Sequence, residues 1–83
     1  IDTAPAASRE KAIERTPVRS SAMRSVGYDQ EQQVLEIEFT NGAVYQYFGV
    51  PVEVYRGLMA AESHGQYFNQ HVRNKSYRYQ RMN

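Results

Sequence analysis

The carboxyl-terminal segment of this chain combines positive charge with aromatic rings, and both features suit a nucleic acid. Residues 63–83 contain four Lys or Arg and no Asp or Glu, whereas residues 1–62 contain six basic and nine acidic residues. Basic side chains neutralise phosphates, and aromatic rings stack on unpaired bases. The first candidate site is therefore a nucleic-acid-binding segment made of Arg73, Lys75, Tyr77, Arg78, Tyr79 and Arg81.

An extended conformation would divide this segment between two faces. Successive side chains of a strand point to opposite sides, so Tyr77, Tyr79 and Arg81 would share one face and Arg78 would lie on the other. If the two tyrosines instead dock onto the domain, only the cations remain to bind phosphate. Four cations predict a weak, salt-sensitive affinity without sequence preference.

Tyr45 and Tyr47 form a second candidate, because rings on a sheet are platforms on which unpaired bases stack. The alternative is that both rings pack in the core beneath the helices. We favour the structural role, since the domain is short of other core residues and Glu36 and Glu38 on the opposite face would repel phosphate.

Other chemistry has little support in the sequence. His64 and His71 are seven residues apart, which is about 10 Å along a helix axis at 1.5 Å per residue and too far to hold one ion. Ser63 is expected to cap a helix rather than to act as a nucleophile. The chain has no cysteine, and its only aspartates are Asp2 and Asp29. We therefore expect no catalytic residue, no metal and no cofactor, and a non-enzymatic binding protein.

The chain also lacks any apolar run approaching the roughly 20 residues that span a bilayer, so no membrane insertion is expected. It begins at Ile1 rather than Met. A cytoplasmic location is favoured, and export followed by amino-terminal processing is the alternative.

Alternation marks the clearest strand. Leu35, Ile37 and Phe39 would share one face, with Glu36 and Glu38 on the other. The dipeptide that follows, Asn41-Gly42, tolerates the positive φ of a tight hairpin turn. The sequence thus predicts an antiparallel meander of three strands, at Met23–Tyr28, Val34–Thr40 and Ala43–Phe48.

The turn leaves two registers open. In a two-residue turn, Phe39 lies opposite Val44, and Tyr45 and Tyr47 are exposed. In a three-residue loop closed by a left-handed glycine, Phe39 lies opposite Ala43 and both tyrosines join the core. We favour the second register because it buries two more rings.

Two short helices are expected after the meander, packed on one of its faces. Val52, Tyr55, Leu58 and Met59 recur at helical spacing, so the first helix would begin after Pro51 and end near Ala61. The second would begin after the Ser63 cap and close at residues 73–75. The remaining residues, 76–83, would either extend along the sheet edge or fray.

The fold class predicted is α+β in one domain. Residues 1–19 are rich in Ala, Pro, Ser, Thr and charge, and we expect them to form a flexible, disordered arm. Residues 20–80 would form the domain, and residues 81–83 a frayed end.

The chain resembles the KTSC domain, a module found as a single-domain bacterial protein and at the carboxyl terminus of some lysyl-tRNA synthetases. The resemblance covers residues 20–79. The matching residues are Ser20-Ser21, Val26-Gly27-Tyr28, Leu35-Glu36-Ile37-Glu38-Phe39, Asn41-Gly42, Tyr45-Gln46-Tyr47, Gly49-Val50-Pro51, Val54-Tyr55, Ala61-Glu62-Ser63, Gly65, Tyr67-Phe68-Asn69 and Val72-Arg73.

This resemblance implies RNA or tRNA as a partner, through the family's association with a tRNA synthetase, and it implies no catalytic residue. The function expected is a small module that binds RNA or single-stranded nucleic acid. The alternative is a protein-interaction module, with an exposed sheet face bearing Val34, Val44 and Phe48 or an open strand edge as its binding surface.

Overall fold

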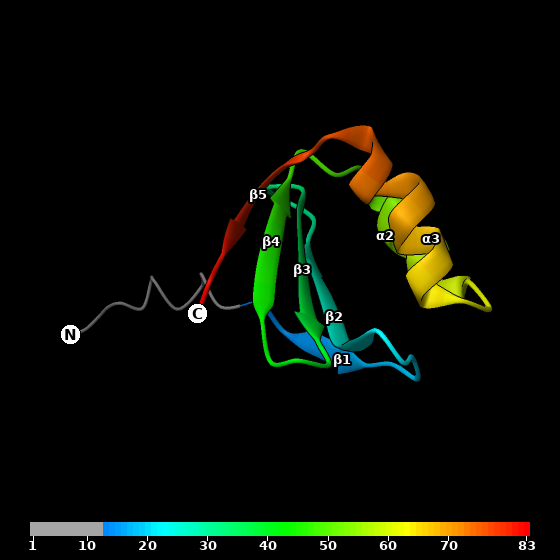
Figure 1. Ribbon diagram of the computed structural model, residues 1–83. Coiled ribbons are helices and arrows are strands. Elements are labelled where there is room, and N and C mark those ends of the chain that lie inside the picture. The colour runs from blue at the N-terminus through cyan, green and yellow to red at the C-terminus, as the bar shows by residue number, and fades with distance from the viewer. Residues whose placement is uncertain (1–12) are drawn as a thin grey trace.

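The computed structural model describes residues 13–83, which form one five-stranded antiparallel sheet with two helices and a short 3₁₀ turn (Figure 1). The strands lie in the sheet in their order along the chain. In sequence order the elements are β1 (Arg15–Pro17), β2 (Met23–Asp29), β3 (Val34–Phe39), β4 (Val44–Phe48), α2 (Val52–Ala60), α3 (His64–His71), the 3₁₀ turn η1 (Arg73–Lys75) and β5 (Arg78–Arg81).

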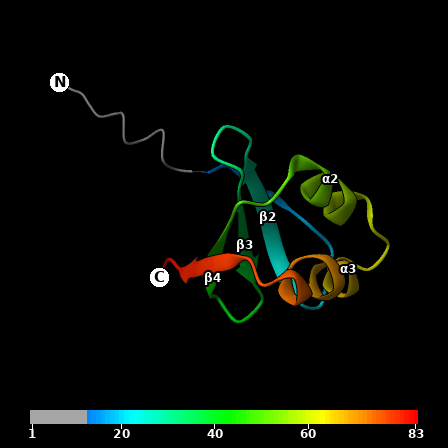
Figure 2. The ribbon, with the colours of Figure 1, turned by 90° about the horizontal axis from the view of Figure 1, so that it is seen from above.

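Both helices lie on the same face of the sheet, as predicted, and the two views agree on this (Figures 1 and 2). The core lies between these two layers. Ser63 caps α3 as expected, because its side chain accepts a hydrogen bond from the Gln66 backbone N–H at 3.3 Å. The fully buried core side chains come from both layers and include Met23, Val26, Leu35, Ile37, Val50, Leu58 and Val72.

The favoured hairpin register is confirmed. Tyr45 lies opposite Ile37 and Tyr47 lies opposite Leu35, so both tyrosines are on the helix-covered face. Gly42 has a φ of +93°, and its N–H donates to the Phe39 carbonyl at 2.9 Å. The Phe39 N–H in turn donates to the Ala43 carbonyl at 2.8 Å. The turn is therefore the three-residue loop with a left-handed glycine.

The prediction of three strands is wrong, because two short edge strands flank the meander. One of them, β1, lies within the segment expected to be a flexible arm, and it pairs with β2 from Arg15↔Gly27 to Pro17↔Ser25. Residues 1–12, the rest of that arm, lie outside the described residues. A non-local ion pair adds to this strand pairing, because the Arg15 guanidinium donates to the Glu36 carboxylate at 2.9 Å.

Gly27 lies where the chain that enters β1 crosses β2. A Cβ added at Gly27 would meet the Glu14 carbonyl oxygen at 2.3 Å, so the chain entering β1 runs directly over this position. A three-residue strand with a proline carries no alternation to detect, and Pro17 is tolerated because β1 is at the sheet edge.

The carboxyl terminus also differs from what the sequence predicts. Residues 78–81 form β5 along β4, which is the extended alternative of the prediction. Residues 81–83, expected to fray, continue this attachment. The Met82 N–H donates to the Val44 carbonyl at 2.7 Å, and the Asn83 amide group donates to Gly42 and accepts from the Val44 N–H at 2.8 and 3.0 Å.

No helix within residues 13–83 has both the length and the apolar character needed to cross a membrane.

Candidate functional site

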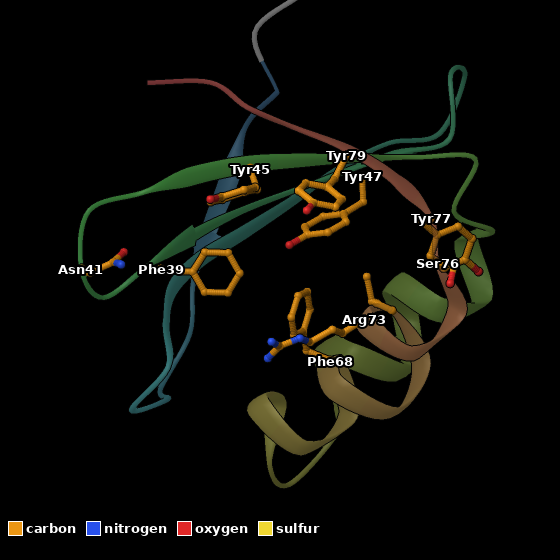
Figure 3. Close-up of a pocket in the computed structure, with 10 residues that line it drawn as sticks. Phe39, Asn41, Tyr45, Tyr47, Phe68, Arg73, Ser76, Tyr77 and Tyr79 are labelled. Atoms are coloured by element: carbon orange, nitrogen blue, oxygen red, sulfur yellow. The ribbon is translucent and has the colours of Figure 1, made fainter.

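A groove of about 850 Å³ opens between the helix-covered face of β4 and β5 and the segment from α3 through η1 (Figure 3). One wall carries the rings of Tyr45, Tyr47 and Tyr79, and the other carries Phe68 and Arg73 (Figure 3). The complete lining is Phe39, Asn41, Tyr45, Tyr47, Phe68, Val72, Arg73, Ser76, Tyr77 and Tyr79. We call it the aromatic groove.

Two tyrosines of the groove are held in place by phenylalanines of the core. Tyr45 meets Phe39 edge-on at 5.9 Å between ring centroids, and Tyr47 meets Phe68 edge-on at 5.5 Å. Phe39 and Phe68 meet each other in the same geometry at 5.5 Å. Edge-to-face pairs at these distances stabilise one arrangement of the rings, so this wall of the groove is preorganised.

Tyr79 differs from these two because most of its surface is free. Its ring lies 5.8 Å from Tyr45 and 5.7 Å from Tyr47, so two tyrosines support it from within the sheet. Its residue surface is nevertheless 64% exposed, and the only other large hydrophobic residue exposed among residues 13–83 is Met82. Tyr79 is thus a supported ring with an available face, which is what stacking by an unpaired base requires.

Arg73 brings positive charge to the opposite wall. Burial, together with the neighbouring Tyr45 and Tyr79, raises the pKa of Tyr47 to about 12, and the Arg73 guanidinium acts in the opposite direction. Arg73 is therefore close enough to Tyr47 to influence its ionisation. No carboxylate of residues 13–83 lines the groove, so its polar groups are hydroxyls, one amide and one cation. Such a lining favours an anionic ligand over a cationic one.

The structure divides the predicted nucleic-acid-binding segment. Strand pairing places Tyr79 opposite Tyr47 and Arg81 opposite Tyr45, so both are on the groove side of β5. Arg78 is on the opposite face, where its guanidinium carbon lies 5.9 Å from the centroid of the Phe48 ring. The alternation expected for an extended segment is confirmed, and the basic residues do not form one continuous surface.

Two further members of that segment lie next to β5 in the chain. Lys75 belongs to η1 and is exposed. Tyr77 is half-buried, packs against the core and also lines the groove. Tyr77 therefore has a structural role in addition to any contact with a ligand.

The polar side chains on the outer face of the sheet mostly form hydrogen bonds with one another. The Glu36 carboxylate accepts from Arg15 at 2.9 Å and from the Gln46 side-chain amide at 2.8 Å. Ser25 donates to Glu38 at 3.0 Å. Of the apolar residues expected there, Val34 is buried, while Val44 and Phe48 are half-buried. The broad exposed apolar patch expected for a protein-binding face is absent from the described part of the sheet.

Sequence reasoning missed several lining residues because they come from separate elements. Phe39 and Asn41 are at the β3–β4 turn, Phe68 and Val72 are at the end of α3, and Ser76 follows η1. Helical spacing identified Phe68 and Val72 as apolar positions, but it could not show that Phe68 meets Tyr47 or that both residues line one groove. Ser76 has a φ of +60°, which turns the chain from η1 into β5.

The two histidines have separate local partners. The His64 Nδ1 lies 2.7 Å from the Leu58 carbonyl and donates to it, whereas the His71 ring packs against the Tyr67 ring with centroids 4.2 Å apart and planes tilted by 31°. Within residues 13–83, no three side chains of His, Cys, Asp or Glu gather as a metal site would require.

Comparison with known proteins places this chain among similar domains. A protein of Stutzerimonas stutzeri is 49% identical over 70 residues, which cover 84% of this chain and 99% of that protein. A crystal structure of a KTSC domain protein from Yersinia pestis superposes with a TM-score of 0.78 at 37% identity, covering 87% of this chain and all of that one.

A lysine–tRNA ligase of Nostoc punctiforme is 44% identical over 55 residues, which are 66% of this chain but 10% of that enzyme. The similarity therefore concerns a small part of the ligase.

The family model of the KTSC domain matches residues 19–77, from the residues before β2 through η1 to Tyr77. This span holds every lining residue of the aromatic groove except Tyr79. The match and the two relatives of similar length agree with the resemblance drawn from the sequence, and this chain belongs to the KTSC domain family.

Proposed function

We propose that this protein is a non-enzymatic module that binds single-stranded RNA in the aromatic groove. The observation that carries the proposal is Tyr79, a residue that is 64% exposed, whose ring is supported by two tyrosines and which lines the same groove as Arg73. Base stacking on an aromatic ring contributes about 1–3 kcal/mol per base and tolerates any sequence.

Charge supports the same ligand. Arg73 and Arg81 lie on the groove side of the domain, and residues 63–83 contain no acid to repel phosphate. The matched region within a lysine–tRNA ligase makes RNA, and tRNA in particular, the first ligand to test.

The test is an NMR titration of the isotope-labelled protein with short single-stranded RNA and with tRNA at two salt concentrations. We expect amide shifts in β5 and η1 that fade as salt rises, with log K falling by roughly 0.7 per log unit of salt for each phosphate neutralised. Tyr79→Ala should weaken RNA binding by about 1–3 kcal/mol.

Arg78 provides a matched control, because it belongs to the same strand as Arg81 but lies on the opposite face. Arg81→Gln should weaken RNA binding and reduce the salt dependence, whereas Arg78→Gln should change neither. Equal effects of the two variants, or shifts that avoid the groove, would reject this site. An absence of shifts with every RNA would direct the search to protein partners at the open edges of β1 and β5.

A further inference from the structure

The aromatic groove has different chemistry at its two walls. The β5 wall presents Tyr79 with a free ring face, and the helix wall presents the Arg73 guanidinium beside Phe68 (Figure 3). A ligand that fills the space between these walls would contact a ring on one side and a cation on the other. A nucleotide carries the matching pair of groups, a flat base and a phosphate.

The size of the groove limits how much of a strand it holds. Its volume of about 850 Å³ is that of a small-molecule site, for which about 300–1,000 Å³ is typical. A single-strand-binding surface that tracks several nucleotides instead needs a row of free rings along the backbone. In the groove, Tyr45 and Tyr47 are occupied by contacts to Phe39 and Phe68, and Tyr79 alone is mostly exposed.

We propose that the groove is a mononucleotide site, in which one base stacks on Tyr79 and the attached phosphate pairs with Arg73. This inference rests on the proposed function and adds that the groove recognises a single nucleotide. The remaining lining groups complete the site: Asn41 lies at one end of the groove, and Ser76 and Tyr77 lie at the other (Figure 3). These amide and hydroxyl groups can donate to and accept from the edge of a base or the sugar hydroxyls.

The polar groups that line the groove favour a nucleotide over a nucleoside as its ligand. A phosphate receives charge-assisted hydrogen bonds from a guanidinium, and these are about twice as strong as bonds between neutral groups. Among residues 13–83, Arg73 is the one cation that lines the groove, and no carboxylate there competes for it. A neutral ligand would leave this interaction unused.

The experiment titrates the full chain with AMP, with adenosine and with inorganic phosphate, and follows the amide and ring resonances by NMR. We expect AMP to shift Tyr79 and the residues around Arg73, and to bind about tenfold more tightly than adenosine, which corresponds to one charge-assisted contact. Inorganic phosphate alone should bind more weakly than AMP, because it lacks the stacking contact.

Three variants separate the two halves of the site. Tyr79→Leu should abolish the advantage of AMP over phosphate, and Arg73→Gln should abolish the advantage of AMP over adenosine. Arg78→Gln, on the opposite face, should leave all three affinities unchanged. Because Tyr79, Arg73 and Arg78 are all exposed, none of these changes removes a core side chain.

The outcomes distinguish this inference from the proposed function. If single-stranded RNA binds in the groove but AMP does not, the mononucleotide site is rejected while RNA binding stands. If AMP and inorganic phosphate bind equally, the stacking half of the site is rejected. If neither AMP nor RNA shifts the groove residues, both proposals fail.

Discussion

Arg73 lies across the aromatic groove from Tyr47 and opposes the burial that, together with neighbouring tyrosines, raises the pKa of the Tyr47 hydroxyl to about 12. The tyrosine comes from β4 and the arginine from the turn that follows α3, so their proximity depends on how the helices pack on the sheet. The pKa of Tyr47 therefore depends on how the helices pack against the sheet.

Removing Arg73 should raise the pKa of Tyr47 further. A guanidinium stabilises the nearby tyrosinate, so Arg73→Gln removes the only one of these influences that favours the ionised form. The measurement is an alkaline titration of the tyrosine ring resonances, with Tyr47→Phe used to assign the late step. A Tyr47 titration that is unchanged in Arg73→Gln would show that the two groups do not interact.

The raised pKa of Tyr47 also predicts how stability depends on pH. Its pKa is about 12 in the folded chain, against 10.0 for the ordinary residue, so between these values the unfolded chain holds fewer protons than the folded chain. Stability from this group is therefore complete below about pH 10 and is lost as the pH rises toward 12. Urea unfolding over this range should show a smaller loss in Tyr47→Phe. An equal loss in both proteins would contradict the assignment to Tyr47.

Gly27→Ala should destabilise the protein through its amino-terminal strand. The added Cβ would overlap the Glu14 carbonyl oxygen, which is backbone and cannot rotate away, and overpacking of this kind costs about 1–3 kcal/mol. In a chain that begins at Val18, the overlapping residues are absent and the cost should disappear. The measurement is the free energy of unfolding in urea, for Gly27 and for Gly27→Ala, in the full chain and in the chain that begins at Val18.

Gly65→Ala is the matched control for this substitution. A Cβ at Gly65 would meet its nearest neighbour, the Ala22 Cβ, at an ordinary 3.6 Å, and Gly65 lies within α3. The change should leave stability equal or raise it by up to about 1 kcal/mol. A cost of Gly27→Ala that persists without residues 1–17 would show that the clash with β1 is not its cause.

Asn83→Ala should loosen β5. The Asn83 side chain bonds to Gly42 and Val44 at the β3–β4 turn, and each lost hydrogen bond contributes about 0.5–1.5 kcal/mol. We expect faster amide hydrogen exchange in β5 and weaker RNA binding, because Tyr79 depends on this strand. Asn69→Ala, at an exposed position of α3, should change neither quantity. Unaltered exchange in β5 would show that the terminal side chain does not hold the strand.

The sequence by itself determined the local parts of this protein. Alternation from Val34 to Phe39 and the Asn41-Gly42 turn specified the central hairpin, because a half-buried strand and a tight turn are local requirements. They left two registers open, and the burial of Tyr45 and Tyr47 favoured the one that the structure has. The Ser63 cap is of the same kind. The motif order across residues 20–79 also identified the family, whose model matches residues 19–77.

Only the tertiary structure decided the two edge strands and the groove. β1 pairs with β2, the Arg15 side chain reaches Glu36, and the chain passes close over Gly27, so β1 depends on residues that are far from it in the sequence. The groove likewise forms only where β4 and β5 face the end of α3, so alternation alone could not place Arg73 opposite Tyr79. Periodicity reports how a segment is oriented relative to its own axis, whereas a site between segments depends on which surfaces meet.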